Sequence, residues 1–201
     1  MVDDGRPGLQ WNEAAITNAR RLEGPVLVVG GSGFIGANLF HSLASVRNDV
    51  FACSRNPRHA WRLAAVPSSR LLDLDITNHD RVLDVLRSLK PRTVFNLTAY
   101  GGYERQKHAP TIHATNYIGT LNLLRAASDT GCDAFVHAGS SSEYGLNCAA
   151  PSEDSELLPN SDYAVSKVGA SYLVKYYGKI FQFPYVNLRL FSIFGPWEER
   201  D

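Results

Sequence analysis

The sequence VLVVGGSGFIG, residues 26–36, decides the fold of this chain. Its first four residues are apolar and predict a short buried strand of a parallel sheet. Glycines follow at positions one, four and seven of a loop, and residues 36–45 are predicted to form a helix. Such a loop can turn sharply and approach a pyrophosphate, and the helix N-terminus presents free N–H groups to the anion. The stretch therefore predicts a dinucleotide-binding loop, with an ordinary glycine-rich turn as the alternative, and the loop residues concerned are Gly30, Gly33, Phe34, Ile35 and Gly36.

Strands and helices alternate along the rest of the chain. Apolar runs predict further strands, and helical patterns lie between them; the strands are at 49–53, 71–74, 93–97, 134–138 and 185–190, and the helices at 80–89, 110–127 and 163–181. This alternation predicts an α/β Rossmann fold with a doubly wound parallel sheet. Residues 25–201 are predicted to form the NAD(P)-binding domain with the catalytic residues. Residues 1–24 are expected to be an N-terminal extension with a short amphipathic helix at 11–22.

The composition argues against several other functional classes. Lys plus Arg and Asp plus Glu both number 20, so no net charge attracts nucleic acid or an anionic membrane. No apolar run approaches the roughly 20 residues that span a bilayer, and the polar N-terminus differs from a secretory signal. Cys53, Cys132 and Cys148 are an odd number of cysteines without the spacing of metal ligands. They predict reduced thiols in a cytoplasmic protein and no metal site.

The residues after the second predicted strand bear on the choice of cofactor. NAD-binding folds usually place an acid there, about 20 residues after the glycines, to bind the ribose hydroxyls. This chain has Ser54 and Arg55 and no carboxylate, so nothing repels a 2′-phosphate and Arg55 can pair with it. The pattern favours NADP over NAD, and the alternative is a solvated loop arginine.

Asp75 and Ile76 follow the third predicted strand. The Asp75 carboxylate is expected to accept a hydrogen bond from the adenine amino group while Ile76 packs beside the ring. The alternative, which is compatible with the first, is a helix cap, with Thr77 or Asn78 as the N-cap of the helix that follows.

Tyr163 and Lys167 are candidates for proton transfer. They stand at positions i and i+4 and therefore share one face of a predicted helix. A free tyrosine has a pKa of about 10, and a lysine ammonium beside it is expected to lower that pKa. The phenol can then exchange a proton with a sugar hydroxyl during hydride transfer, while Lys167 also holds the nicotinamide ribose. The alternative is chance spacing on an amphipathic helix.

Ser140 lies in a serine-rich loop, 139–145, after the fifth predicted strand. Doubly wound folds bind their ligands at this edge of the sheet, so a hydroxyl there can orient the substrate oxygen toward Tyr163. The alternative is a simple serine-rich turn.

Together these motifs resemble the extended short-chain dehydrogenases/reductases, and among them the NAD-dependent epimerase/dehydratases of nucleotide-diphosphate sugars. The resemblance covers the chain from about residue 25 to residue 201. It rests on the glycine loop, the serine loop that ends in EYG at 143–145, the Tyr163–Lys167 pair, and the sequences NYIGT at 116–120 and RLFSIFGP at 189–196.

The resemblance implies roles for individual residues. Ser140 matches the catalytic Ser/Thr, Tyr163 the acid/base and Lys167 its partner. Residues from the fourth strand and from the end of the sixth are implied to line the cofactor: Leu97, Thr98, Ala99 and Phe191. Substrate binding is implied for Ser141, Ser142 and Ser192. Because 4,6-dehydratases usually carry acids at the first two of these positions, the serines argue against water elimination.

The function implied by the resemblance is an NAD(P)-dependent nucleotide-sugar epimerase or oxidoreductase that works through a keto sugar. One alternative is an NADPH-dependent 4-keto-6-deoxysugar reductase, since Glu143 beside Tyr144 resembles some of these enzymes. Another is a non-catalytic NADP-binding sensor, although the intact Tyr163 and Lys167 argue against it. A homodimer is expected. The C-terminal substrate domain is expected to be missing, because family members continue well beyond this length.

Overall fold

The computed structural model of this chain describes residues 11–199. Its centre is a sheet of six parallel strands in the order β3-β2-β1-β4-β5-β6. The strands are β1 (Val26–Val29), β2 (Val50–Ser54), β3 (Leu71–Asp73), β4 (Thr93–Asn96), β5 (Ala134–Ser140) and β6 (Tyr185–Leu190). The chain builds outward from β1 to β3 and then starts again on the other side of β1. This reversal confirms the predicted doubly wound Rossmann sheet.

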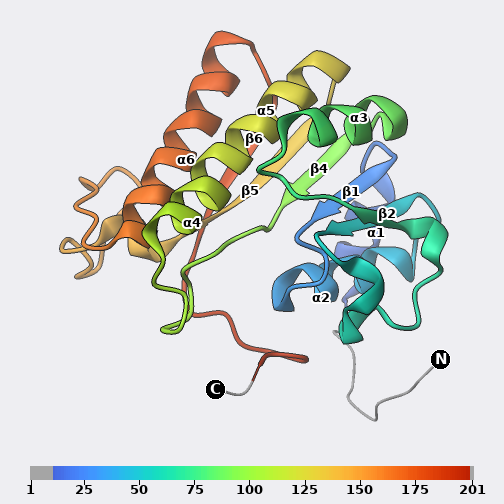
Figure 1. Cartoon of the computed structure of the whole chain (residues 1–201), viewed down its shortest axis with the longest axis horizontal. Helices are drawn as coiled ribbons and strands as arrows, with labels where there is room; N and C mark the ends of the chain where they lie inside the picture. Colours follow the sequence, from blue (N-terminus) through green and yellow to red (C-terminus); the bar gives the residue numbers. More distant parts are fainter. Residues whose placement is uncertain (1–10, 200–201) are drawn as a thin grey trace.

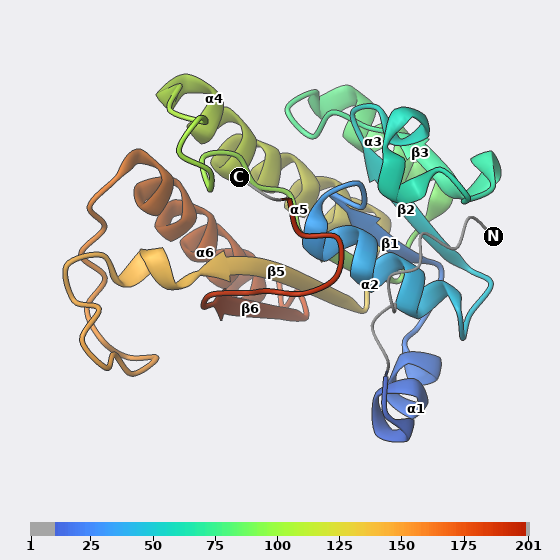
Figure 2. The ribbon, with the colours of Figure 1, turned by 90° about the horizontal axis from the view of Figure 1, so that it is seen from below.

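Helices cover both faces of the sheet (Figure 1). Figure 2 shows α3, α4, α5 and α6 on one side of the strands and α1 and α2 on the other. The helices are α1 (Glu13–Arg21), α2 (Phe34–Ala44), α3 (His79–Leu89), α4 (Ala109–His113), α5 (Gly119–Thr130) and α6 (Asp162–Ile180). Both faces of the central strands are therefore covered, which accounts for their continuous apolar sequence.

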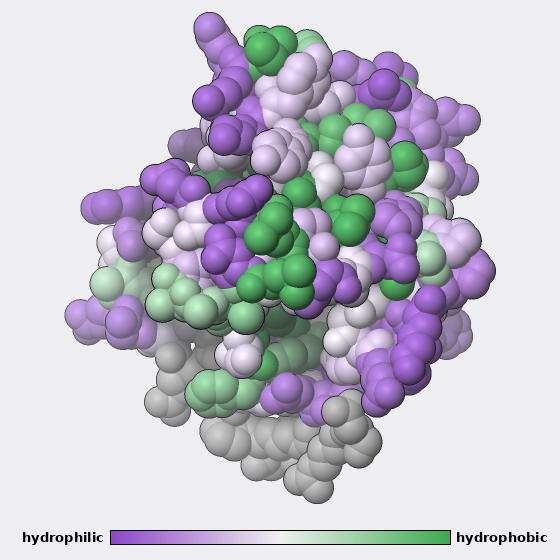
Figure 3. All heavy atoms as spheres, turned by 90° about the vertical axis from the view of Figure 1, so that its left-hand side faces the viewer, coloured by the Kyte–Doolittle hydropathy of each residue, from purple (hydrophilic) through white to green (hydrophobic). Residues whose placement is uncertain are grey.

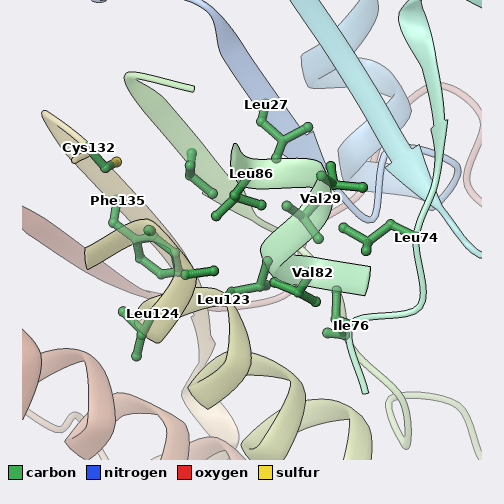
Figure 4. Packing of buried hydrophobic residues seen from close by; sticks show 14 of the residues in the cluster. Leu27, Val29, Leu74, Ile76, Val82, Leu86, Leu123, Leu124, Cys132 and Phe135 are labelled. Carbon is green, nitrogen blue, oxygen red and sulfur yellow. The ribbon is translucent and has the colours of Figure 1, made fainter. Parts of the chain in front are cut away.

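The side chains of β1 divide the core into two layers. Leu27 and Val29 face α3, α5 and α6, where Figure 4 shows them in one cluster with Leu86, Leu123 and Phe135. The alternating residues Val26 and Val28 face the opposite way and pack with α2. All four residues of β1 are at most 1% exposed, so the short run fixes the two layers at once.

One predicted helix is interrupted in the structure. The segment predicted as a single helix at 110–127 consists of α4, a π-helical turn at Ala114–Ile118, and α5, which continues to Thr130. Asn116 lies in this turn and bonds both backbone groups of Tyr100: its Nδ2 donates to the carbonyl at 2.8 Å, and its Oδ1 accepts from the N–H at 2.9 Å. These tertiary contacts accompany the break, and π turns often occur at functional sites.

The N-terminal helix α1 lies against the domain. Ala19 is 5% exposed and belongs to the core layer that α2 covers. Arg47 Nη1 donates to the carbonyls of Ala19 at 2.9 Å and Leu22 at 2.6 Å, and its other nitrogens pair with Asp49. Residues 11–22 are therefore tied to the body of the fold. The predicted boundary at residue 24 stays a prediction, and residues 1–10 lie outside the described part.

The edge of the sheet beyond β5 is formed by β6. Within residues 11–199 no further strand pairs with the outer side of β6. Val186 and Leu188 project from the face of the sheet opposite α6, and they are 49% and 42% exposed. None of the helices in the described range combines the length and apolar character that a membrane span requires.

Candidate active site

A cleft of about 760 Å³ opens where β1, β2 and β4 end. This is the switch point of the strand order, where doubly wound sheets bind their ligands. Nine predicted cofactor residues line it: Gly30, Gly33, Ser54, Arg55, Asp75, Ile76, Leu97, Thr98 and Ala99. Prediction from sequence missed the wall that the start of α4 and the adjoining π turn provide: Pro110, Thr111, Ala114 and Thr115.

Each of the three glycines of the loop is required for a different structural reason. Gly30 has a φ of +81°, and a Cβ there would lie 3.0 Å from the Leu97 carbonyl carbon. At Gly36 a Cβ would lie 2.2 Å from the Gly30 oxygen, so the helix can approach the loop only without a side chain. Gly33 faces the cleft, and the nearest atom to its Cβ would be 3.3 Å away. A side chain at Gly33 would thus enter the cleft and needs the Gly30 carbonyl to move by only a few tenths of an ångström, a far smaller shift than at Gly36.

Phe34, Ile35 and Gly36 form the first turn of α2 and do not belong to the cleft wall. The helix begins two residues earlier than predicted. Phe34 and Ile35 are partly exposed. Their assignment to cofactor binding stays a prediction.

Two buried hydroxyls in the cleft wall have no partner among the described residues. These are Ser54 Oγ at the end of β2 and Thr98 Oγ1 after β4. Buried polar groups are nearly always hydrogen-bonded, so each hydroxyl fits a polar group of a ligand. With the glycine loop between them, the wall fits an extended dinucleotide that carries ribose hydroxyls and a pyrophosphate.

The structure confirms the predicted helix cap at Asn78, while the contact of Asp75 with adenine stays a prediction. It lines the cleft, and its Oδ1 accepts from the N–H of Thr77 at 2.9 Å and from its hydroxyl at 2.8 Å. Asn78 is the N-cap of α3 and accepts from Arg81 N at 3.0 Å. The carboxylate thus stabilises its own turn while facing the cleft, and Ile76 lies beside it, 4% exposed.

The predicted catalytic residues converge beside the cleft. Ser140 is the last residue of β5, Tyr163 lies in the first turn of α6, and Lys167 follows one turn later. Lys167 is 2% exposed; its Nζ donates to the Ala138 carbonyl at 2.9 Å and lies 5.9 Å from the centre of the Tyr163 ring. A methyl group placed on Gly101 would lie 3.2 Å from that ring, so Tyr163 adjoins the loop that follows Tyr100 in the cleft wall.

The electrostatics of Tyr163 differ from the expectation. Burial raises its pKa above the usual value, a hydrogen bond with Ser140 partly opposes this, and the charge of Glu143 adds to it. The predicted net lowering of the Tyr163 pKa was wrong for this structure, because burial dominates, while the Lys167 ammonium donates to the Ala138 carbonyl and lies 5.9 Å from the ring centre. Burial also lowers the pKa of Lys167 to about 8, against the opposing charge of Glu143. At neutral pH Tyr163 is therefore a phenol, and most of Lys167 is charged.

Glu143 holds the backbone of Ser140 through a buried hydrogen bond. Its side chain is fully buried, and its Oε1 accepts from the backbone N–H of Ser140 at 2.8 Å. Arg189 Nε donates to the other carboxylate oxygen at 3.2 Å, and burial raises the pKa of Glu143. A Cβ on Gly139 would lie 2.5 Å from Oε1, so glycine before the serine makes room for the acid. The contact between the Glu143 carboxylate and the Ser140 backbone could not be predicted from the run of serines in the sequence.

Asn116 joins the cleft wall to the catalytic helix. Besides its bonds with Tyr100, its Nδ2 donates to Ser166 Oγ at 2.9 Å, and Ser166 Oγ donates to the Tyr163 carbonyl at 2.7 Å. From sequence, Asn116 is recognisable only as part of the NYIGT motif. The π-helical turn that contains it depends on tertiary contacts, so helical periodicity could not predict it.

A buried polar cluster lies under this site and consists of Asn96, Thr120 and His137. Asn96 Nδ2 donates to Thr120 Oγ1 at 3.1 Å and lies 3.2 Å from His137 Nδ1. His137 is fully buried, and its Nε2 has no partner among the described residues. Burial, with a smaller contribution from the charge of Lys167, lowers the pKa of His137 to about 3, so the ring is neutral.

The predicted substrate residues lie on two sides of Ser140. Ser141 and Ser142 are half-buried in the helical turn after it, and Ser142 N donates to Ser140 Oγ at 3.1 Å. Phe191 lies outside the dinucleotide cleft; its ring is 6.3 Å from that of Tyr144, beside a second cavity of about 910 Å³ that α6, β6 and residues 151–157 line. Ser192 is exposed. The structure therefore places Phe191 away from the cleft it was predicted to line.

In the part of the chain that the structure describes, no three His, Cys, Asp or Glu side chains gather in a way that could hold a metal ion. Cys53, Cys132 and Cys148 are free cysteines. Burial raises the pKa of the Cys53 thiol to about 12 and that of Cys132 to about 11. These two thiols are protonated at neutral pH and therefore poor nucleophiles.

Comparison with known proteins agrees with this geometry. The UDP-glucose 4-epimerase of Rhizobium meliloti is 31% identical over 177 residues, which cover 85% of this chain and 52% of that protein. The structure of UDP-glucuronic acid 4-epimerase from Bacillus cereus in complex with NAD superimposes with a TM-score of 0.73 at 28% identity, over 86% of this chain and 58% of that one. For the epimerase Mth375 of Methanothermobacter thermautotrophicus the TM-score is 0.80 at 26% identity, over 92% and 56%.

The chain spans about half the length of the curated relatives it matches, between 49% and 57% of each. A family model described as "NAD dependent epimerase/dehydratase family" matches residues 26–201, from the first residue of β1 onward. The glycine loop, the cleft at the switch point and the serine, tyrosine and lysine beside it all fall inside this range. The chain therefore belongs to the NAD-dependent epimerase/dehydratase family.

Proposed function

We propose that this chain is the cofactor-binding and proton-transferring part of a nucleotide-sugar epimerase or a closely related oxidoreductase. One observation carries the proposal: Ser140, Tyr163 and Lys167 meet at the carboxyl edge of the sheet, next to a cleft whose glycine loop and unpartnered hydroxyls suit a dinucleotide. The names of the relatives, which include UDP-glucose and UDP-glucuronate epimerases, support a nucleotide-diphosphate sugar as the substrate.

In the proposed reaction the residues of this chain position a sugar hydroxyl and move its proton. Ser140 Oγ holds the sugar oxygen, and Tyr163 takes its proton or returns it. A bound nicotinamide dinucleotide would accept the hydride from the same carbon and give it back. The phenol favoured by burial is ready to protonate an alkoxide. In the opposite direction, the Tyr163 phenolate takes the proton of the sugar hydroxyl and becomes a phenol, and the charged Lys167 stabilises that phenolate before the transfer.

Arg55 is the residue proposed to decide between the two nicotinamide cofactors. It lines the cleft beside Ser54, and the end of β2 has no carboxylate to repel a 2′-phosphate. The comparisons do not support a preference for NADP, because the similar solved structures that hold a dinucleotide hold NAD. Direct titration with both cofactors is the test.

The proposed function is tested with a protein that contains these residues and any natural sequence that flanks them. UDP-glucose, UDP-glucuronate and dTDP-glucose are incubated with NAD or NADP, and products are followed by NMR. Epimerisation changes the sugar without net formation of reduced cofactor. A keto-sugar reductase would instead consume NADPH in proportion to product, and a non-catalytic sensor would bind cofactor and convert nothing. Either of these two results would replace the epimerase proposal.

A homodimer is part of the proposal. Val165, Tyr172, Tyr176 and Ile180 share one face of α6 and are between 47% and 65% exposed. Figure 3, which looks onto the α6 side of the molecule, shows hydrophobic residues gathered among polar ones on this face. Sedimentation velocity with wild type and Tyr176→Glu tests the assignment: a wild-type protein that sediments as a monomer removes it.

A further inference from the structure

A buried arginine lies behind the glycine loop, outside the proposed catalytic group. Arg62 belongs to a short helical turn, Trp61–Leu63, between β2 and β3, and only 6% of its side chain is exposed. Its own carbonyl accepts from His41 Nε2 at 2.8 Å, which ties this turn to α2. A guanidinium at such a depth needs partners for its donors, and those partners identify what the residue does.

The partners of Arg62 come from two segments far apart in sequence. Its Nη1 donates to the carbonyl of Ser32, inside the glycine loop, at 3.3 Å. Its Nε and Nη2 both donate to the carbonyl of Trp197, at 3.0 and 2.8 Å. Nη1 also lies 3.6 Å from a carboxylate oxygen of Glu199. One planar group therefore joins the cofactor loop to residues 195–199, which we name the tail segment.

Other contacts hold the tail segment in the same place. Asn38 Nδ2, on α2, donates to the Pro196 carbonyl at 2.7 Å, and the rings of His41 and Trp197 meet edge to face at 4.9 Å. Trp197 has a φ of +66°, a conformation that persists in a residue other than glycine only where the surroundings hold it. Figure 2 shows the chain after β6 (red) passing alongside α2. The tail segment is thus docked by specific contacts.

We propose that Arg62 is a positioning residue for the dinucleotide. Ser32 lines the cleft and Arg62 does not, so the bond between them turns the Ser32 carbonyl away from the ligand. A carbonyl oxygen facing the cleft would repel a pyrophosphate, whereas a fixed loop presents its N–H groups to the anion. This inference rests on the proposed function, because it concerns the same cofactor cleft.

The same bonds couple the cleft to the tail segment. If the Ser32 and Trp197 carbonyls share one guanidinium, a ligand that fixes the loop also fixes Arg62 and the tail segment. Thermodynamic linkage makes the effect reciprocal: docking of the tail segment favours cofactor binding, and cofactor binding favours docking. Residues that never touch the cofactor would then influence its affinity.

The test compares two buried arginines. Arg62→Met removes the charge and the donors while keeping an unbranched side chain, and Arg62→Lys keeps the charge but loses the planar fork that spans two carbonyls. Arg47→Met is the matched control: Arg47 is also buried, with 8% of its side chain exposed, and also ties two segments through main-chain carbonyls, those of Ala19 and Leu22. It holds α1, and no residue of the cleft wall bonds to it.

Affinity for NAD is measured by calorimetric titration. Loss of a charged hydrogen bond predicts roughly ten- to a hundredfold weaker binding for Arg62→Met, an intermediate loss for Arg62→Lys, and less than twofold change for Arg47→Met. Equal losses in Arg62→Met and Arg47→Met would mean general destabilisation and would overturn the inference. Wild-type affinity in Arg62→Met, or full affinity in Arg62→Lys, would overturn it as well.

Amide hydrogen exchange measures the coupling separately. Without ligand, Arg62→Met should exchange faster than wild type both in residues 30–36 and in the tail segment, and Arg47→Met in neither. Addition of NAD should slow exchange in the tail segment of the wild type, and it should leave exchange in the tail segment of Arg62→Met unchanged. Faster exchange in one segment alone would overturn the coupling. A wild-type protein that binds neither NAD nor NADP would refute the proposed function, while the ligand-free exchange still decides whether Arg62 joins the two segments.

Discussion

Acidification tests the buried polar cluster under the catalytic residues. His137 is fully buried on β5, and burial, with the charge of Lys167, lowers its pKa to about 3. In the unfolded chain a histidine has a pKa of about 6.5. Between these values the unfolded chain binds a proton that the folded protein does not. Stability is therefore retained above pH 6.5 and is lost as the pH falls from 6.5 toward 3.

The size of the loss follows from the two pKa values. Each pH unit below 6.5 is worth about 1.4 kcal/mol per group, so His137 alone removes about 2 kcal/mol between pH 7.5 and pH 5. His137→Gln deletes the titrating ring, and its amide oxygen can still accept a hydrogen bond from Asn96. The variant is expected to be less stable at pH 7.5 and to lose about 2 kcal/mol less than wild type on acidification.

Urea unfolding followed by far-UV circular dichroism at several pH values between 7.5 and 5 gives the free energy of unfolding at each pH. Comparing slopes removes the packing cost of the substitution and the titration of all other groups. His79→Gln, at an exposed histidine, controls for the loss of an imidazole. If wild type and His137→Gln lose stability in parallel, His137 is not kept neutral by the fold and the reasoning fails.

Three further predictions concern the cleft. Gly33→Val should abolish dinucleotide binding with little loss of stability, because its side chain enters the cleft. Gly36→Ala should instead lower the melting temperature, because a Cβ there would lie 2.2 Å from a backbone oxygen. Calorimetric titration and thermal melts separate the two variants, and equal behaviour would contradict the assignment. Arg55→Ala should weaken NADP about ten- to a hundredfold more than NAD if the arginine pairs with a 2′-phosphate, and equal titration results for both cofactors would refute that pairing. Tyr163→Phe in the complete enzyme should fold and bind cofactor but turn over roughly 10²–10⁴ times more slowly. Ser140→Ala should also turn over more slowly, and the loss in the double variant should be less than the sum of the two single losses. Turnover of Tyr163→Phe at the wild-type rate would remove the catalytic proposal.

Much of the fold could be predicted from local sequence. The four buried residues of β1 and the glycines after them determine the strand, the loop and the start of α2, since each requirement lies within one short segment. The predicted strands all exist in the structure. The break at Ala114–Ile118 could not be predicted, because it accompanies contacts of Asn116 with Tyr100, which the fold brings near.

The candidate site could be predicted only in part, for a similar reason. The spacing of Tyr163 and Lys167 places both on one face of α6, but only the fold shows that the ammonium is directed to the Ala138 carbonyl. The contact of Glu143 with the Ser140 backbone and the bridge that Arg62 makes between Ser32 and Trp197 join residues that no periodic pattern relates. Sequence motifs thus predicted residues that the fold brings to the cleft and beside it, and they missed the residues that hold these in place.

The outer edge of β6 has a consequence for handling the protein. Backbone N–H and C=O groups along an unpaired parallel strand can pair with a strand from another molecule, and Val186 and Leu188 offer an apolar surface beside that edge. Charged residues and prolines protect such edges in many proteins, but the exposed face of this strand carries neither at these two positions. Association of the protein at high concentration is therefore expected to involve this edge, and Val186→Lys should reduce that association.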